Sequence, residues 1–125
     1  MKENELSAPE LVSRCFAART AAHLFHLETG SYAEHMALGD FYDEIASGAD
    51  KFVECFQGVF GKIKRYPDDE ETETRTAPIP MIAALRTWLV DHRDECSKDE
   101  SELENLVDEL LATCDRTLYK LKYLK

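Results

Sequence analysis

Four side chains in the first half of the sequence have the chemistry and the spacing to hold a metal ion. They are His23 and His35, twelve residues apart, followed by Asp50 and Glu54, four residues apart. Imidazole nitrogens and carboxylate oxygens form a ligand set that suits iron and zinc. If the helices on either side of Thr29-Gly30 are antiparallel, they pair positions whose numbers sum to about 59, so we expect His23 to face His35.

The two carboxylates cannot reach the histidines within one chain. Asp50 and Glu54 lie one helical turn apart and within roughly 100° of His35 around the helix axis. Fifteen residues of helix, at a rise of ~1.5 Å each, nevertheless separate His35 from Asp50 by ~22 Å. A shared site therefore requires a second copy of the chain, packed antiparallel about a two-fold axis, and each dimer then has two sites.

A purely structural interpretation of the same residues is also open. In it, the two histidines hydrogen-bond to each other or to Tyr32 inside the hairpin, and the two carboxylates pair with Lys51 or another surface base. This interpretation predicts a well-ordered hairpin and no bound metal.

The spacing of these four residues resembles the ferroxidase signature of the Dps miniferritins. In that family the site lies between subunits, with histidines from one chain and an Asp and a Glu from its partner. The resemblance implies that the four residues are iron (Fe) ligands and that any enzymatic reaction is Fe(II) oxidation by peroxide or oxygen. Zn and Mn are alternative metals, because the same ligands serve all three. Two positions differ from the family: Gly39 replaces a further Asp, and Leu24 replaces a Trp.

The chain as a whole resembles short ferritin-like proteins that are encoded by tailed phages and lack an assigned function. The resemblance includes the segments at 23–27 and 117–122. It implies a phage origin and a location in the host cytoplasm. It also leaves open an alternative function, a non-catalytic acidic protein that binds a host factor or mimics nucleic acid on the same fold.

Apolar residues recur at helical spacing along most of the chain, and no segment shows the alternation of a strand. We expect a single domain, 1–125, with helices at about residues 8–28, 32–63, 80–93 and 98–124 and an acidic loop at 64–78. Ser7, Ser31 and Ser97 are each followed by a glutamate three residues later, the pattern of a capped helix start. The predicted fold is an all-α, ferritin-like four-helix bundle with a long connection between its second and third helices.

Composition narrows the classes of partner. The 125 residues include 25 Asp and Glu against 15 Lys and Arg, a net charge of −10, which opposes binding to the phosphate backbone of DNA. No apolar run approaches the ~20 residues that cross a bilayer, and the N-terminus lacks a signal-peptide pattern, so we expect a cytoplasmic protein without a membrane partner. The four cysteines show no C-x-x-C spacing and are predicted to be buried free thiols.

Overall fold

The computed structural model describes residues 7–68 and 76–125, so part of the predicted acidic loop lies outside the described residues. Within them the chain forms four helices and no strand, which confirms the all-α prediction. The helices are α1 (Ser7–Glu28), α2 (Tyr32–Phe60), α3 (Pro78–Ser97) and α4 (Ser101–Tyr123).

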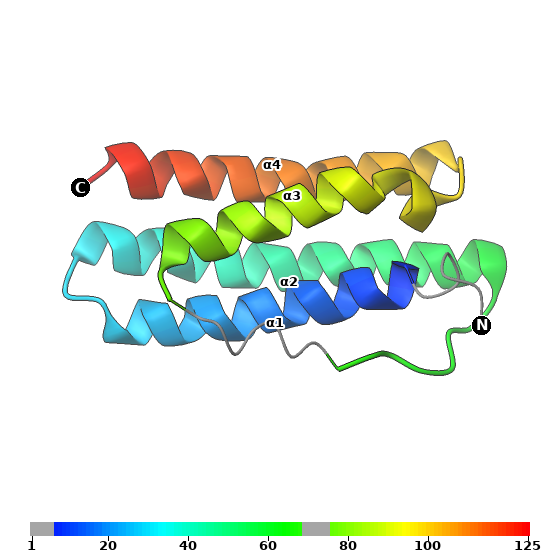
Figure 1. The fold of residues 1–125 in the computed structure, drawn as a ribbon, viewed down its shortest axis with the longest axis horizontal. Helices are drawn as coiled ribbons and strands as arrows, with labels where there is room; N and C mark the ends of the chain where they lie inside the picture. The colour runs from blue at the N-terminus through cyan, green and yellow to red at the C-terminus, as the bar shows by residue number, and fades with distance from the viewer. Residues whose placement is uncertain (1–6, 69–75) are drawn as a thin grey trace.

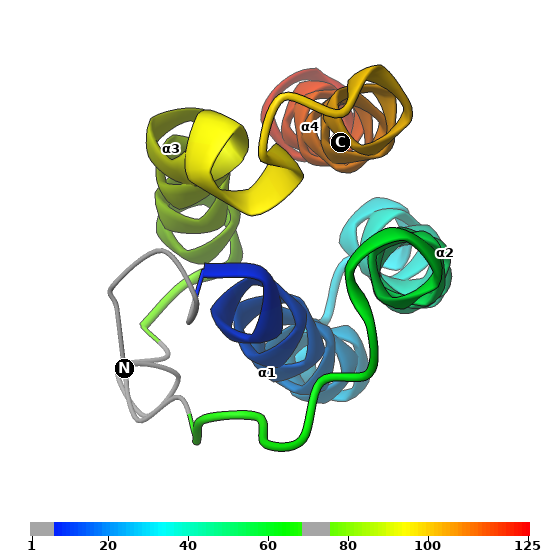
Figure 2. The same ribbon diagram turned by 90° about the vertical axis from the view of Figure 1, so that its right-hand side faces the viewer.

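The helices lie side by side as a bundle whose corners, taken in order, are α1, α2, α4 and α3 (Figure 2). Neighbouring helices run in opposite directions, whereas α2 and α3 lie on a diagonal and run the same way (Figure 1). Ion pairs between α2 and α4 show the antiparallel register directly. Asp40 contacts Lys120 at 3.3 Å, and Glu44, one turn later on α2, contacts Arg116, one turn earlier on α4, at 3.5 Å.

One apolar core runs along the bundle axis and takes side chains from every helix. On α2 the fully buried residues follow steps of three and four, which places them on one face of the helix. The largest fully buried side chains of the core are Phe41, Phe52, Leu11, Leu38, Ile45, Ile82, Leu89, Leu103 and Leu110. Burial of this continuous face is the main force that holds the helices together.

Three of the four cysteines belong to this core. Cys15, Cys96 and Cys114 are buried, Cys55 is half-buried, and all four are free thiols. Burial raises the pKa of Cys96 and of Cys114 to about 12, and it raises the pKa of Cys15 further still. The core thiols are therefore neutral at physiological pH and act as small apolar side chains.

The helix ends test the capping prediction. The Ser31 hydroxyl accepts a hydrogen bond from the backbone N–H of Glu34 at 3.2 Å, so the predicted cap of α2 is confirmed. The Ser7 hydroxyl instead donates to Glu95 on α3. The prediction for Ser97 is wrong, because α3 continues four residues past its expected end and Ser97 is its last residue.

The turn between α3 and α4 explains that difference. Lys98 and Asp99 both have left-handed backbone angles, with φ of 51° and 65°, and they reverse the chain after α3. Ser97 is completely buried, and its hydroxyl donates to the Asp94 carbonyl at 3.4 Å. The start of α4 therefore moves to Ser101, with Glu100 as its N-cap residue.

In the described ranges, 7–68 and 76–125, each helix is too short or too polar to cross a lipid bilayer.

Candidate functional site

The hairpin between α1 and α2 is joined by a reciprocal pair of histidines. His26 Nδ1 donates to the backbone carbonyl of His35 at 2.6 Å, and His35 Nδ1 donates to the backbone carbonyl of His26 at 2.7 Å. The two imidazole rings are stacked, with their centroids 3.6 Å apart and their planes 17° from parallel. Both rings are half-buried, and each has an Nε2 atom that this pairing leaves unused.

His23 lies beside this pair and not opposite His35. Its ring stacks on Tyr42 of α2 with centroids 4.2 Å apart, and it meets His26 edge-on at 6.0 Å. The expectation that His23 faces His35 is therefore corrected: His26 takes that place. Pairing residues by the sum of their numbers ignores the angle at which each side chain leaves the helix axis. His26 follows the fully buried Ala22 by one helical turn, so it lies near the buried face, whereas His23 is exposed.

Gly39 makes room for the histidine pair. A Cβ atom at this position would lie 3.2 Å from His26 Cε1 and 3.3 Å from His26 Nδ1, closer than side chains normally approach. Gly39 is thus the point at which α2 approaches the imidazole of α1. The sequence signal that marks His26 is its position one helical turn after the buried Ala22 on α1.

Asp50 and Glu54 lie further along α2, and both are exposed. Throughout the part of the chain that the structure describes, neither carboxylate forms an ion pair or a side-chain hydrogen bond, and Lys51 pairs with neither. No three His, Cys, Asp or Glu side chains among the described residues converge as a metal site. A site made from all four predicted residues would therefore take ligands from a second copy of the chain.

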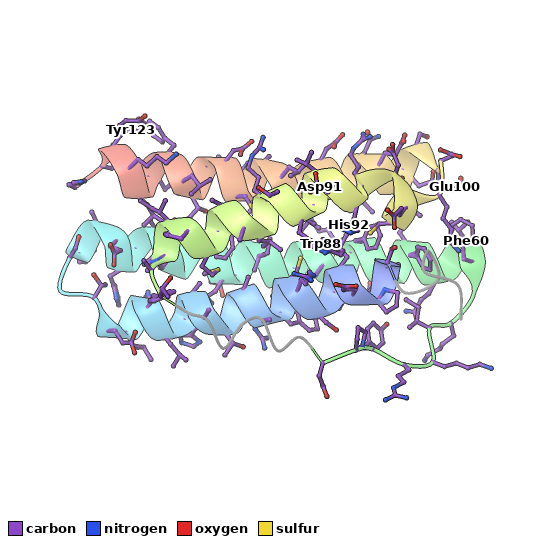
Figure 3. All side chains as sticks on the ribbon, viewed as in Figure 1. Phe60, Trp88, Asp91, His92, Glu100 and Tyr123 are labelled. Atoms are coloured by element: carbon purple, nitrogen blue, oxygen red, sulfur yellow. The ribbon has the colours of Figure 1, made fainter. Side chains whose placement is uncertain are left out.

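Another histidine shows how the bundle uses imidazole structurally. His92 Nδ1 donates to the Trp88 carbonyl at 2.9 Å, and its ring stacks on the indole one turn earlier on α3 (Figure 3). The guanidinium of Arg14, on α1, lies 4.9 Å from the centre of that indole ring. His92 thus joins α3 to its own preceding turn, while His26 and His35 join two different helices.

The structure is thus an all-α bundle in which the α1–α2 hairpin carries His23, His26 and His35, and α2 carries the exposed Asp50 and Glu54. The chain belongs to the family of unknown function DUF5856, which matches residues 26–121. That span includes His26, His35, Asp50 and Glu54 and begins after His23. Neither a curated protein nor a solved structure matches the chain.

Proposed function

We propose that the protein binds a divalent metal ion between two copies related by a two-fold axis, in the manner of a Dps-like, ferritin-like protein. Iron is the first candidate for this ion. His23 and His35 of one copy and Asp50 and Glu54 of the other supply the ligands. The observation that carries the proposal is that these side chains retain unused donor atoms at the surface of the α1–α2 pair. Elsewhere on the surface, many carboxylates are already paired with arginine or lysine.

The donor set fits such an ion chemically. His35 donates through Nδ1 to a carbonyl, so its Nε2 retains the lone pair that a metal requires. Two carboxylates one turn apart on α2 add negative charge and oxygen ligands. A bound iron ion would supply the one-electron chemistry of Fe(II) oxidation, and the chain's own residues would hold it and balance its charge.

Exposed apolar side chains near the same hairpin support an assembled state. Leu27 is 66% exposed and Tyr32 is 77% exposed, with Leu24 and Met36 close by in the sequence and also exposed. A second copy packed on this end of α1 and α2 would remove such surface from water, which favours association. The homo-oligomer is therefore part of the same proposal as the metal.

The test is a titration of the purified protein with anaerobic Fe(II), measured by calorimetry and by metal analysis. We expect His35→Ala and Asp50→Ala each to abolish binding. Asp91→Ala is the matched control, because it removes an exposed carboxylate of α3 (Figure 3) and should leave binding unchanged. Wild-type protein without metal above background would overturn the proposal.

Mixing the two inactive variants tests whether the site is shared between copies. When His35→Ala and Asp50→Ala chains are unfolded together and refolded in equal amounts, half of the dimers are mixed, and each mixed dimer regains one intact site. Roughly a quarter of the wild-type sites should therefore return. A site within one chain would give no recovery at all.

A second candidate function is a non-catalytic acidic protein that binds a basic surface of a host protein. It is favoured by exposed acids without a basic partner among the described residues, namely Asp99, Glu102 and Glu109. Such a surface attracts a cationic partner at long range and loses it as salt is added. A partner that is captured by wild-type protein and also by a variant with Asp99→Lys and Glu102→Lys would exclude this use of the surface.

A further inference from the structure

The reciprocal hydrogen bonds determine the tautomer of both rings in the hairpin. A backbone carbonyl only accepts hydrogen bonds, so the Nδ1 atoms of His26 and His35 must both carry a proton. In a neutral imidazole the other nitrogen, Nε2, then holds a lone pair. This is the reverse of an arrangement in which Nε2 carries the proton and cannot bind a metal.

We propose that His26 is a positioning residue that holds the His35 ring in place and presents its Nε2 atom to the metal. The inference rests on the proposed function, because it concerns the same site. The His26 ring lies against one face of the His35 ring, and its Nδ1 hydrogen bond fixes the backbone of residue 35. Metal-binding histidines are commonly oriented by an Nδ1–H bond to a carbonyl; His35 makes this bond to the backbone of residue 26, and the His26 ring adds the stacked face.

His26 is itself held by its surroundings, so it can act as a fixed support. Its ring stands edge-on to Tyr42, at a centroid distance of 5.3 Å and an angle of 81°. Gly39 lies against the ring on the α2 side, where an added Cβ would lie 3.2 Å from His26 Cε1 and would press on the ring. The His35 ring therefore packs on a support that α1 and α2 hold together.

The geometry also excludes His26 as a second ligand to the same ion as His35. A metal binds an imidazole nitrogen close to the plane of the ring. The two rings are nearly parallel and 3.6 Å apart, so an ion in the plane of one lies well outside the plane of the other. His26 thus acts through His35 and not by direct coordination.

The first measurement needs no metal. Nitrogen NMR of the imidazole groups in metal-free protein should show His35 with its proton on Nδ1. His26→Ala keeps the backbone carbonyl that accepts from His35 Nδ1, but it removes the stacked ring and the bond to the residue-35 carbonyl, so we expect the population of the His35 Nδ1–H tautomer to fall. His92→Ala is the matched control, because it removes another stacked, carbonyl-bonded histidine that lies on α3.

The second measurement is binding of Zn²⁺ and of anaerobic Fe²⁺ to the same variants. Loss of an outer-shell partner commonly weakens metal affinity by about 10–100-fold, and because His26→Ala keeps the carbonyl that accepts from His35, we expect a decrease of about 10-fold. His26→Phe keeps a stacking ring without the hydrogen bond, and we expect it to recover part of the affinity and of the Nδ1–H signal. His92→Ala should bind as the wild type does.

A third variant serves if His26→Ala fails to fold. Gly39→Ala should shift the His26 ring and lower the population of the His35 Nδ1–H tautomer, whereas Gly58→Ala, where a Cβ meets nothing within 4 Å, should not. Wild-type His35 with its proton on Nε2, or unchanged affinity in His26→Ala, overturns the inference. If wild-type protein binds neither metal, the proposed function is wrong, and so is the presentation of Nε2 to a metal. The NMR result is independent of metal binding and still decides whether His26 orients the His35 ring.

Discussion

The α1–α2 and α3–α4 hairpins are both antiparallel helix pairs in one bundle, yet they are joined by different interactions. Between α3 and α4, Arg93 makes a two-pronged contact with Asp108, at 2.7 Å and 3.0 Å, and Arg86 pairs with Asp115. Between α1 and α2, stacked rings and reciprocal backbone hydrogen bonds replace these ion pairs.

The ion pairs between α3 and α4 also show which carboxylates already have a basic partner. Arginine balances the charge of the α4 carboxylates it contacts and occupies part of their hydrogen-bonding capacity, so those carboxylates are less available to another cation. On α2, Asp50 and Glu54 have no such partner in the described residues. Exposed acids without a basic partner among the described residues also occur in the α3–α4 half, at Asp91, Asp99 and Glu102, so the two halves differ in how their helices are joined and not in whether acids remain unpaired.

The largest predicted effect is that of alkaline pH on the free energy of unfolding. The groups responsible are the buried thiols, two of the three of which lie in the α3–α4 half. Their pKa is raised in the folded protein, so the stability they contribute is complete below about pH 9 and is lost as pH rises toward 12. The free energy of unfolding should fall by roughly 1.4 kcal/mol per pH unit for each thiol. Urea unfolding from pH 9.5 to 11 measures this slope.

Removing one thiol measures how much it contributes to the pH dependence of the free energy of unfolding. Cys96→Ala should lower the number of protons released on unfolding by about one, whatever it does to stability at neutral pH. Thr117→Ala, which likewise truncates a buried side chain but on α4, should leave the slope unchanged. Equal slopes in wild-type protein and Cys96→Ala would show that Cys96 does not have a raised pKa in the folded protein.

The contact that joins the two hairpins gives the next largest effect. At Gly48 of α2, an added Cβ would lie 2.6 Å from Cδ2 of Leu110, a buried core residue of α4. Overpacking of this kind costs about 1–3 kcal/mol, so Gly48→Ala should be destabilised in thermal or urea unfolding. Gly58→Ala on the same helix has open space and should gain up to about 1 kcal/mol from its helix propensity. A stabilised Gly48→Ala protein would show that the hairpins are more loosely joined.

The ion pairs of the α3–α4 half should contribute less. Asp108 is about half exposed, and Asp108→Asn should cost below about 1 kcal/mol at low salt. The cost should decrease in 1 M NaCl, because salt screens exposed charges, whereas the stacked rings of the α1–α2 half should be insensitive to salt. Asp91→Asn is the unpaired control. A cost that salt does not change would mean that Asp108 acts through packing.

The smallest effect concerns Cys55, which lies on α2 outside the fully buried core. It is half-buried, whereas the other three thiols are buried, so a small alkylating reagent should modify Cys55 first in native protein. Mass spectrometry after limited labelling would locate the adduct, and the unfolding midpoint should hardly move. Equal labelling of all four thiols would show that the core opens readily.

Several features were predictable because they depend on local periodicity. The buried stripe of α2 and the Ser31 cap both follow from residues within one or two turns of each other. The end of α3 was not predictable in this way, because the left-handed turn at Lys98 and Asp99 carries none of the glycine that usually marks such a turn. The donor residues could be listed, but their pairing could not.

The sequence by itself determined that this is an all-α chain with a histidine-rich hairpin and an excess of acidic residues, since composition and helical spacing are properties of the chain alone. Only the tertiary structure decided that His26, and not His23, meets His35, and that Asp50 and Glu54 have no partner in the described residues. The physical reason is that contacts between helices depend on the rotation of each helix about its axis, which is set by packing of the whole core.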